Sequence, residues 1–256
     1  MEPVTTDSRA DDGARAEELT ERLAAVNRRI DAALLESGRT DRPQLIVVTK
    51  YFPVADIRIL ADLGVADLGE NRDQEVSAKA QELAGLGLRW HFIGQLQTNK
   101  ARSVARYAHA VHSVDRASLV KALGKGIAVE RETSPERPSL KCFIQVDLSG
   151  ADGATAGVSG HQRGGASPQE VNTLGHLIEA TAGLSLAGVM AVAPLGHEPL
   201  AAFHQLAGIS ALLRGEFPAA AAISAGMSGD LEAAVAAGAT HLRIGSQVLG
   251  ERPPLG

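Results

Sequence analysis

The chain of 256 residues has few aromatic side chains and almost no cysteine. Phe, Trp and Tyr together make up 3% of the residues, and only two of these are tyrosines, so the core must be aliphatic and few phenol groups are available for chemistry. The single cysteine, Cys142, excludes an internal disulfide and favours a reducing compartment. It lies in the apolar run 140–146, where a small buried thiol is the expected role.

The sequence also lacks the charge and hydropathy patterns of nucleic-acid-binding and membrane proteins. The net charge is −5, so the chain lacks the excess of basic residues that is typical of nucleic-acid-binding proteins. No apolar stretch approaches the roughly 18 residues that a membrane span needs, and the polar, acidic N-terminus has no apolar signal region. We therefore expect a cytoplasmic protein that binds neither nucleic acid nor membrane. Residues 1–13 are expected to form a disordered tail, and residues 14–256 a single domain.

Several common catalytic motifs are missing as well. The chain contains no G-x-x-x-x-G-K-[ST] phosphate loop, no G-x-S-x-G nucleophile elbow and no H-E-x-x-H zinc motif. His109 and His112 are close in sequence, but a strand over 110–114 would place them on opposite faces. We therefore predict no metal site.

Short apolar or β-branched runs alternate with helical stretches along most of the chain. Eight runs are predicted to be strands: 45–49, 66–69, 88–94, 110–114, 140–148, 186–192, 221–225 and 240–245. Helices are predicted over 14–35, 54–63, 73–84 and 200–213, and a further helix start is predicted at Ser167–Glu170, which has the pattern of a capping box. Eight repeats of this kind are typical of a (β/α)₈ barrel. A doubly wound open sheet is the alternative, but no G-x-G-x-x-G turn follows the first strand.

In a barrel, the carboxyl ends of the strands face the active site. Lys50 directly follows the first predicted strand, where a desolvated amine can form a Schiff base with a carbonyl compound. The same lysine could instead reach the barrel mouth or pair with Glu70.

The second candidate cluster follows the seventh and eighth predicted strands. Gly226 and Gly229 allow the backbone to approach an anion, and Ser228 is predicted to open a helix. Gly245 and Ser246 add an N–H group and a hydroxyl, and Arg243 adds a positive charge. Tight turns and a plain helix cap would explain the same residues without a ligand. A lysine after the first strand and a phosphate-binding site after the seventh and eighth strands would lie on opposite sides of one barrel mouth. A phosphorylated aldehyde would suit that arrangement. The glycine-rich segment 149–166 is predicted to be a flexible loop after the fifth strand.

Six spaced motifs resemble those of a known family. They are VTK (48–50), LGENRDQE (68–75), WHFIGQLQTNK (90–100), HSVD (112–115), GVMAVAP (188–194) and SAGMSGDLEAAVAAGATHLRIGSQVLG (224–250). The chain is similar in these motifs to pyridoxal-phosphate-binding proteins of the YggS/PROSC type, also called pyridoxal phosphate homeostasis proteins. That family resembles the isolated barrel domain of alanine racemase.

The resemblance implies a single (β/α)₈ TIM barrel of the alanine racemase N-terminal type with an added N-terminal helix. It implies pyridoxal 5′-phosphate (PLP) as cofactor, held as a Schiff base on Lys50. The other site residues that it implies are Asn71 and Met190 near the ring, Ser228, Gly245 and Ser246 at the phosphate, Ser224 and Gly226 close by, and Arg243 at the pyridine nitrogen or the phosphate edge. An arginine at that nitrogen would weaken the ring as an electron sink.

Two departures from the family pattern concern the fifth strand and the phosphate loop. Asp147 stands where relatives commonly have asparagine, and no lysine follows within 146–157, so the resemblance does not carry over any second cofactor contact in this loop. Ala225 replaces a usual methionine.

Two functions are compatible with these residues. A carrier would hold PLP reversibly and pass it to apo-enzymes in transient encounters. A PLP-dependent racemase or related amino-acid enzyme would need a second base, which alanine racemases take as a tyrosine from another domain. We expect the carrier, because Tyr51 is predicted to point away from the pocket, Tyr107 is predicted on a helix, and the chain ends soon after the eighth strand. A third possibility is an aldolase that uses a lysine on the same barrel. It fits the predicted phosphate site, but it does not fit a lysine at the end of the first strand flanked by these motifs.

Overall fold

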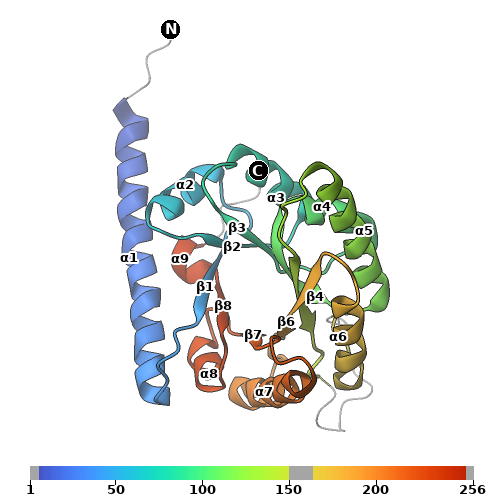
Figure 1. The fold of residues 1–256 in the computed structure, drawn as a ribbon. Coiled ribbons are helices and arrows are strands. Elements are labelled where there is room, and N and C mark those ends of the chain that lie inside the picture. The colour runs from blue at the N-terminus through green and yellow to red at the C-terminus, as the bar shows by residue number, and fades with distance from the viewer. Residues whose placement is uncertain (1–5, 150–163, 252–256) are drawn as a thin grey trace.

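The computed structural model describes residues 6–149 and 164–251 of the chain. Within them, eight parallel strands close into a barrel in which consecutive strands are neighbours and β8 pairs with β1 (Figure 1). The strands are β1 (Gln44–Val48), β2 (Asp67–Glu70), β3 (Arg89–Phe92), β4 (Ala108–Val114), β5 (Leu140–Gln145), β6 (Leu184–Met190), β7 (Ala222–Ser224) and β8 (His241–Ile244). All eight predicted strands are present, with ends displaced by up to three residues. The barrel is confirmed, and closure between β1 and β8 excludes the open sheet.

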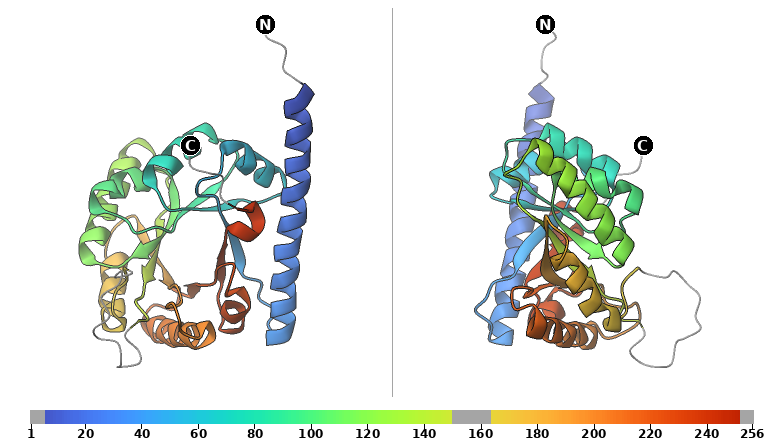
Figure 2. Two further views of the ribbon diagram at one scale, coloured as in Figure 1. Left: turned by 180° about the vertical axis from the view of Figure 1, so that it is seen from behind. Right: turned by 45° about the vertical axis from the view of Figure 1, so that its right-hand side comes forward.

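Helices follow the strands and surround the barrel, as the two views of Figure 2 show. They are α2 (Val54–Asp62), α3 (Asp73–Glu82), α4 (Ala101–Tyr107), α5 (Ala117–Thr133), α6 (Val171–Glu179), α7 (Pro199–Glu216), α8 (Leu231–Ala236) and the short α9 (Ser246–Leu249), with 3₁₀ turns η1 (Thr98–Lys100) and η2 (Pro168–Glu170). The predicted capping box is present, because Ser167 and Glu170 exchange side chain–backbone hydrogen bonds. Most of the segment predicted to be a flexible loop, 150–163, lies outside the described residues.

A long N-terminal helix, α1 (Thr6–Ser37), lies along the outside of the barrel beside α8 and α9 (Figures 1 and 2). Leu19, Val26 and Ile30 are its fully buried contacts with the rest of the core. The helix begins at Thr6 rather than near Ala14, so part of the segment expected to be a tail is helical. The acidic composition of that segment, interpreted as a sign of disorder, is also what favours the N-terminal end of a helix through its dipole.

Side chains alternate between the inside and the outside of the barrel because successive residues of a strand point to opposite faces. On β5, Cys142 and Ile144 belong to the large core between strands and helices, whereas Phe143 packs with Ala110 and Met190 in the smaller inner cluster. The inner layer also contains buried polar side chains. They are Asp67, His91, His112, Ser224 and Arg243. This polar half of the interior leads to the candidate site. No helix in the described part of the chain combines the length and apolar character needed to cross a bilayer.

The β6–β7 pairing depends on a glycine. Gly188 has a φ of 151°, and a Cβ at this position would lie 1.8 Å from the carbonyl oxygen of Ala222 on β7. A side chain would therefore push two hydrogen-bonded strands apart.

We expect Gly188→Ala to lower the free energy of unfolding by about 3 kcal/mol or more, because it adds backbone strain and a clash between backbones. Gly208→Ala is the matched control, since Gly208 is exposed on α7 with no atom within 4 Å of a Cβ. It should leave stability unchanged or raise it by about 1 kcal/mol through helix propensity. Urea unfolding followed by circular dichroism measures both, and a Gly188→Ala protein as stable as the control would contradict this close contact.

Candidate functional site

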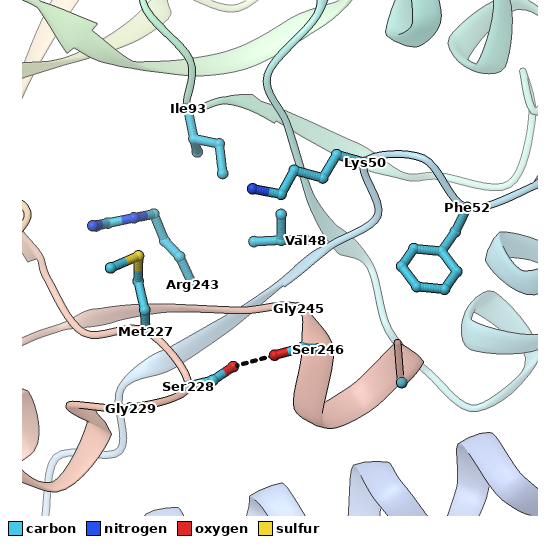
Figure 3. A pocket seen from close by; sticks show the side chains of 11 residues that line it. Val48, Lys50, Phe52, Ile93, Met227, Ser228, Gly229, Arg243, Gly245 and Ser246 are labelled. Atoms are coloured by element: carbon cyan, nitrogen blue, oxygen red, sulfur yellow. Dashed lines mark hydrogen bonds between the residues drawn. The ribbon is translucent and has the colours of Figure 1, made fainter. Parts of the chain in front are cut away.

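A cavity of about 270 Å³ opens where β1 and β8 end (Figure 3). Its volume is close to the lower end of the range for small-molecule pockets. Its lining residues are Val48, Lys50, Phe52, Ile93, Met227, Ser228, Gly229, Arg243, Gly245, Ser246 and Gly250. Five of the nine residues predicted for the site are among them: Lys50, Ser228, Arg243, Gly245 and Ser246. The structure therefore brings the early lysine and the late serine–glycine cluster to one cavity.

Lys50 points into this cavity from the turn after β1 (Figure 3). Its ammonium group makes no hydrogen bond or ion pair with any residue in the described ranges. The alternative in which it pairs with Glu70 is wrong, because the Oε1 atom of Glu70 lies 2.6 Å from the Nζ atom of Lys79 on α3. Lys50 is thus the cavity's available amine.

The backbone before Lys50 is held by that buried ion pair. Lys79 donates a second hydrogen bond to the carbonyl oxygen of Thr49 at 3.0 Å, and the Thr49 hydroxyl donates to Glu70 at 2.8 Å. Burial raises the pKa of Glu70, while the charge of Lys79 opposes that rise. Removing either partner would leave a buried charge without compensation, so the geometry of Thr49 is strongly fixed.

The residue after Lys50 adopts a rare backbone conformation. Tyr51 has a φ of 71°, the left-handed region that side chains disfavour at a cost of about 1–3 kcal/mol, and the turn closes with a hydrogen bond from the Phe52 N–H to the Thr49 carbonyl. The Tyr51 ring packs under the guanidinium of Arg72, 4.9 Å from its centroid. The strained turn therefore places Lys50 in the cavity while the Tyr51 ring is outside its lining.

The opposite wall of the cavity is formed by the loops after β7 and β8. The hydroxyls of Ser228 and Ser246 point toward one another, 3.3 Å apart, and both residues line the cavity (Figure 3). The backbone N–H groups of Ser228, Gly229, Ser246 and Gln247 donate to no oxygen within the described ranges. A Cβ at Gly229 would meet open space, so glycine leaves room beside these donors. Two hydroxyls and several free N–H groups make this wall suited to an anion.

The prediction that Ser228 opens a helix is wrong. Helix α8 begins at Leu231, and its N-cap residue is Asp230. The Asp230 carboxylate accepts a hydrogen bond from the Met227 N–H and so closes the turn that carries Ser228 and Gly229. The turn residues Asp and Gly explain this delay, because both favour turns over a first helical turn.

Arg243 reaches the cavity from β8 and is almost fully buried. It donates to the Ser224 hydroxyl at 2.6 Å and to the Ala191 carbonyl oxygen at 2.9 Å. Burial lowers the pKa of its guanidinium to about 10, which still leaves it charged at neutral pH. The cavity therefore has a fixed positive charge on its inner side.

A chain of hydrogen bonds runs from Arg243 through the barrel interior. Ser224 lies 2.9 Å from Nδ1 of His112, whose Nε2 lies 2.9 Å from Nδ1 of His91, whose Nε2 lies 2.9 Å from the carboxylate of Asp67. Burial lowers the pKa of both histidines, so they are neutral at pH 7. The carboxylate can only accept, which requires that His91 and His112 each carry their proton on Nε2 and that Ser224 donates to His112.

The acid end of this chain is Asp67. Burial raises its pKa, but the hydrogen bonds from His91 and Arg89 outweigh burial and hold it below its usual range. Asp67 is therefore ionised, and all donors in the chain point from Arg243 toward it. This hydrogen-bond chain could not be predicted from the sequence, because its members are spread over five strands.

Four predicted site residues do not line the cavity. Ser224 lies behind Arg243, and Met190 packs against Phe143 in the inner cluster. Gly226 has a φ of 90°, and a Cβ there would lie 2.6 Å from Ala234, so this glycine is needed by the turn. Asn71 follows β2, and its buried Oδ1 has no hydrogen-bond partner. The apolar lining residues Val48, Phe52, Ile93 and Met227 were not predicted for the site. All but Phe52 lie within the motifs quoted above, and Phe52 follows Lys50 by two residues.

Tyr107 and Cys142 lie away from the cavity. Tyr107 donates to Asp73 at 3.2 Å and lines a separate groove between α3 and α4, and burial raises its pKa. Cys142 is buried, and burial raises the pKa of its thiol to about 12. The expected role of Cys142 as a small buried thiol is confirmed. Neither tyrosine lines the cavity.

The chain matches the family model described as "Alanine racemase, N-terminal domain" over residues 23–253. It is 44% identical over 230 residues to a curated pyridoxal phosphate homeostasis protein of Corynebacterium glutamicum, covering 88% of this chain and 98% of that protein. Among solved structures, it is similar to PipY of Synechococcus elongatus with PLP bound, at 33% identity and a TM-score of 0.72, covering 91% of this chain and all of PipY. Alanine racemase of C. glutamicum shares the fold at 14% identity and a TM-score of 0.63, covering 94% of this chain and 63% of the racemase.

The buried neutral histidines predict an acid-sensitive fold. His241 packs against His112 of the hydrogen-bond chain between Arg243 and Asp67. Burial lowers the pKa of His241 from 6.5 to about 4. The unfolded state therefore binds more protons below pH 6.5, so this contribution to stability is complete above pH 6.5 and is lost as the pH falls toward 4.

We expect the free energy of unfolding to decline between pH 6.5 and 4, and His241→Gln to decline less steeply over the same interval. The raised pKa of Glu70 acts in the opposite direction, so the comparison between the two proteins isolates the histidine. Urea unfolding at several pH values measures the slopes. Equal slopes would show that His241 is not held neutral.

Proposed function

Because the chain belongs to the family of pyridoxal phosphate homeostasis proteins, a branch of the alanine racemase N-terminal domain fold, we propose that it binds PLP in this cavity. The cofactor would be held reversibly, as a Schiff base on Lys50, for intracellular homeostasis and for delivery to apo-enzymes. The observation that carries the proposal is the pairing of one uncompensated amine with an anion-binding wall across a single cavity.

The residues present fit the group. PLP supplies an aldehyde, which condenses with a lysine amine with loss of water, and a phosphate that needs several donors. Lys50 provides the amine at the end of its fixed turn. Ser228, Ser246 and the free N–H groups beside them provide the donors, and glycine at 229 leaves the space that a side chain would fill. Val48, Phe52 and Ile93 would cover the faces of the ring.

Arg243 would lie at the ring nitrogen or the phosphate edge. A guanidinium has no proton acceptor, so at the nitrogen it would disfavour protonation of the ring and weaken it as an electron sink. Its position is fixed by Ser224 and Ala191, which leaves it little freedom to turn away. This residue favours holding the cofactor over demanding carbanion chemistry.

Catalysis of racemisation would need an acid–base group on each side of a bound amino acid. Lys50 can serve one side. Tyr51 and Tyr107 lie outside the cavity lining. His91 and His112 are buried in the barrel interior, and their ring nitrogens are engaged in the hydrogen-bond chain to Asp67. We therefore propose no or weak catalysis.

Lys50→Ala is expected to abolish the visible absorbance band that PLP forms with the protein, because Lys50 is the one amine among the described residues that line the cavity. After borohydride treatment of the wild type, mass spectrometry of peptides should find the added pyridoxyl group on Lys50. Lys121→Ala, on the exposed side of α5, is the matched control and should keep the band. Absence of the band in the wild type, or its survival in Lys50→Ala, would refute the proposed site.

Exchange of the α-proton tests the distinction between a carrier and an enzyme. The PLP-loaded protein with L-alanine in D₂O should exchange the α-proton no faster than PLP alone, because neither tyrosine nor any histidine of the described residues lines the cavity as a second acid–base group. Proton NMR measures the rate. Rapid exchange that depends on the protein would instead identify a racemase or related enzyme.

A further inference from the structure

The outer helix α1 contacts the anion-binding wall from behind. Arg29, three-quarters of the way along α1, donates from Nη1 to the carbonyl oxygen of Ser228 at 3.3 Å and to the side-chain oxygen of Gln247. Gln247 in turn donates to the same Ser228 carbonyl at 3.0 Å. The remaining donors of Arg29 bind the carboxylate of Glu232 on α8 at 2.8 Å each. One guanidinium thus ties α1, α8, α9 and the loop after β7 together.

These contacts fix the direction of one peptide unit. The peptide between Ser228 and Gly229 is planar and trans, so its C=O and N–H groups point in opposite directions. Its C=O points toward α1, where two side chains hold it. Its N–H must therefore point away from α1, toward the cavity that both Ser228 and Gly229 line (Figure 3). This N–H is one of the donors without a partner in the described ranges.

The charge of Arg29 does not by itself explain the arrangement. Glu232 neutralises it at close range, and the loop separates the guanidinium from the cavity. The planar fork of an arginine is what allows one side chain to bind a carboxylate, an amide oxygen and a backbone carbonyl together. Its geometry is therefore that of a support for the loop.

We propose that Arg29 is a positioning residue for the phosphate end of the cavity, which holds the Ser228–Gly229 peptide so that the Gly229 N–H donates to the bound anion. The inference rests on the proposed function, since the anion is the phosphate of PLP. It assigns to α1, which lies outside the barrel, a part in ligand recognition. It also predicts that Arg29 acts on the phosphate alone and not on the aldehyde or the ring.

Pyridoxal, which lacks the phosphate, separates this role from a general loss of structure. Arg29→Ala should raise the Kd for PLP about tenfold, the size of one lost hydrogen bond to a charged group. The Kd for pyridoxal should stay within about twofold. Arg29→Lys should behave like Arg29→Ala, because one ammonium cannot hold all three partners. Arg28→Ala, an exposed neighbour on the same helix, is the matched control and should change neither Kd. Absorbance titrations at equal ionic strength measure all of these.

Gln247→Ala provides a second test that leaves α1 unchanged. It removes the other donor to the Ser228 carbonyl and should also weaken PLP more than pyridoxal. Equal weakening of the two ligands by Arg29→Ala, or wild-type affinity in Arg29→Lys, would overturn the inference. Unaltered PLP binding in Arg29→Ala overturns the inference alone, whereas a wild-type protein that binds neither ligand at Lys50 overturns the proposed function with it.

Discussion

The burial of one guanidinium governs the composition of the barrel interior. Arg243 is almost inaccessible to water, and an uncompensated charge at such a depth is very costly. Ser224 and the Ala191 carbonyl satisfy it directly, and Ser224 then requires an acceptor, which His112 supplies. Each further member of the hydrogen-bond chain satisfies the one before it, until the ionised carboxylate of Asp67 accepts the last hydrogen bond, from His91. Ser224, His112, His91 and Asp67 thus form one hydrogen-bond chain that begins at a single charge beside the cavity.

The two walls of the cavity are supported from outside the strands by the same kind of interaction. On the lysine side, the buried Lys79–Glu70 pair holds the carbonyl of Thr49. On the anion side, Arg29 and Gln247 hold the carbonyl of Ser228. In both places a side chain from the helical layer fixes a backbone carbonyl next to a functional residue. The strands set the general position of the site, and the helices set the direction of its donors.

The barrel could be predicted from the sequence because closure needs only repeated local signals. Each strand run had its own hydrophobic pattern, and errors at the ends stayed within three residues. Lys50, Arg243 and Ser246 reach the cavity because the carboxyl ends of strands converge, which is a property of the fold. Ser228 was placed in the cavity but on the wrong element, since the turn formed by Gly229 and Asp230 delays α8. The histidine chain and Arg29 escaped prediction because their partners are distant in sequence, and only the folded packing brings them together.

The same geometry is the physical basis of the proposed carrier role. Reversible storage of an aldehyde needs an amine that water and other amines can displace, and an anchor that retains specificity for the phosphorylated form. Lys50 and the serine–glycine wall line one cavity, and in the proposed function they would supply the amine and the anchor. Proton transfer at an amino acid needs in addition a mobile acid–base group next to the amine. Here the histidines are committed to compensating Arg243, and the tyrosines point elsewhere. The interactions that stabilise the charge in the barrel are therefore the ones that withdraw its titratable groups from chemistry.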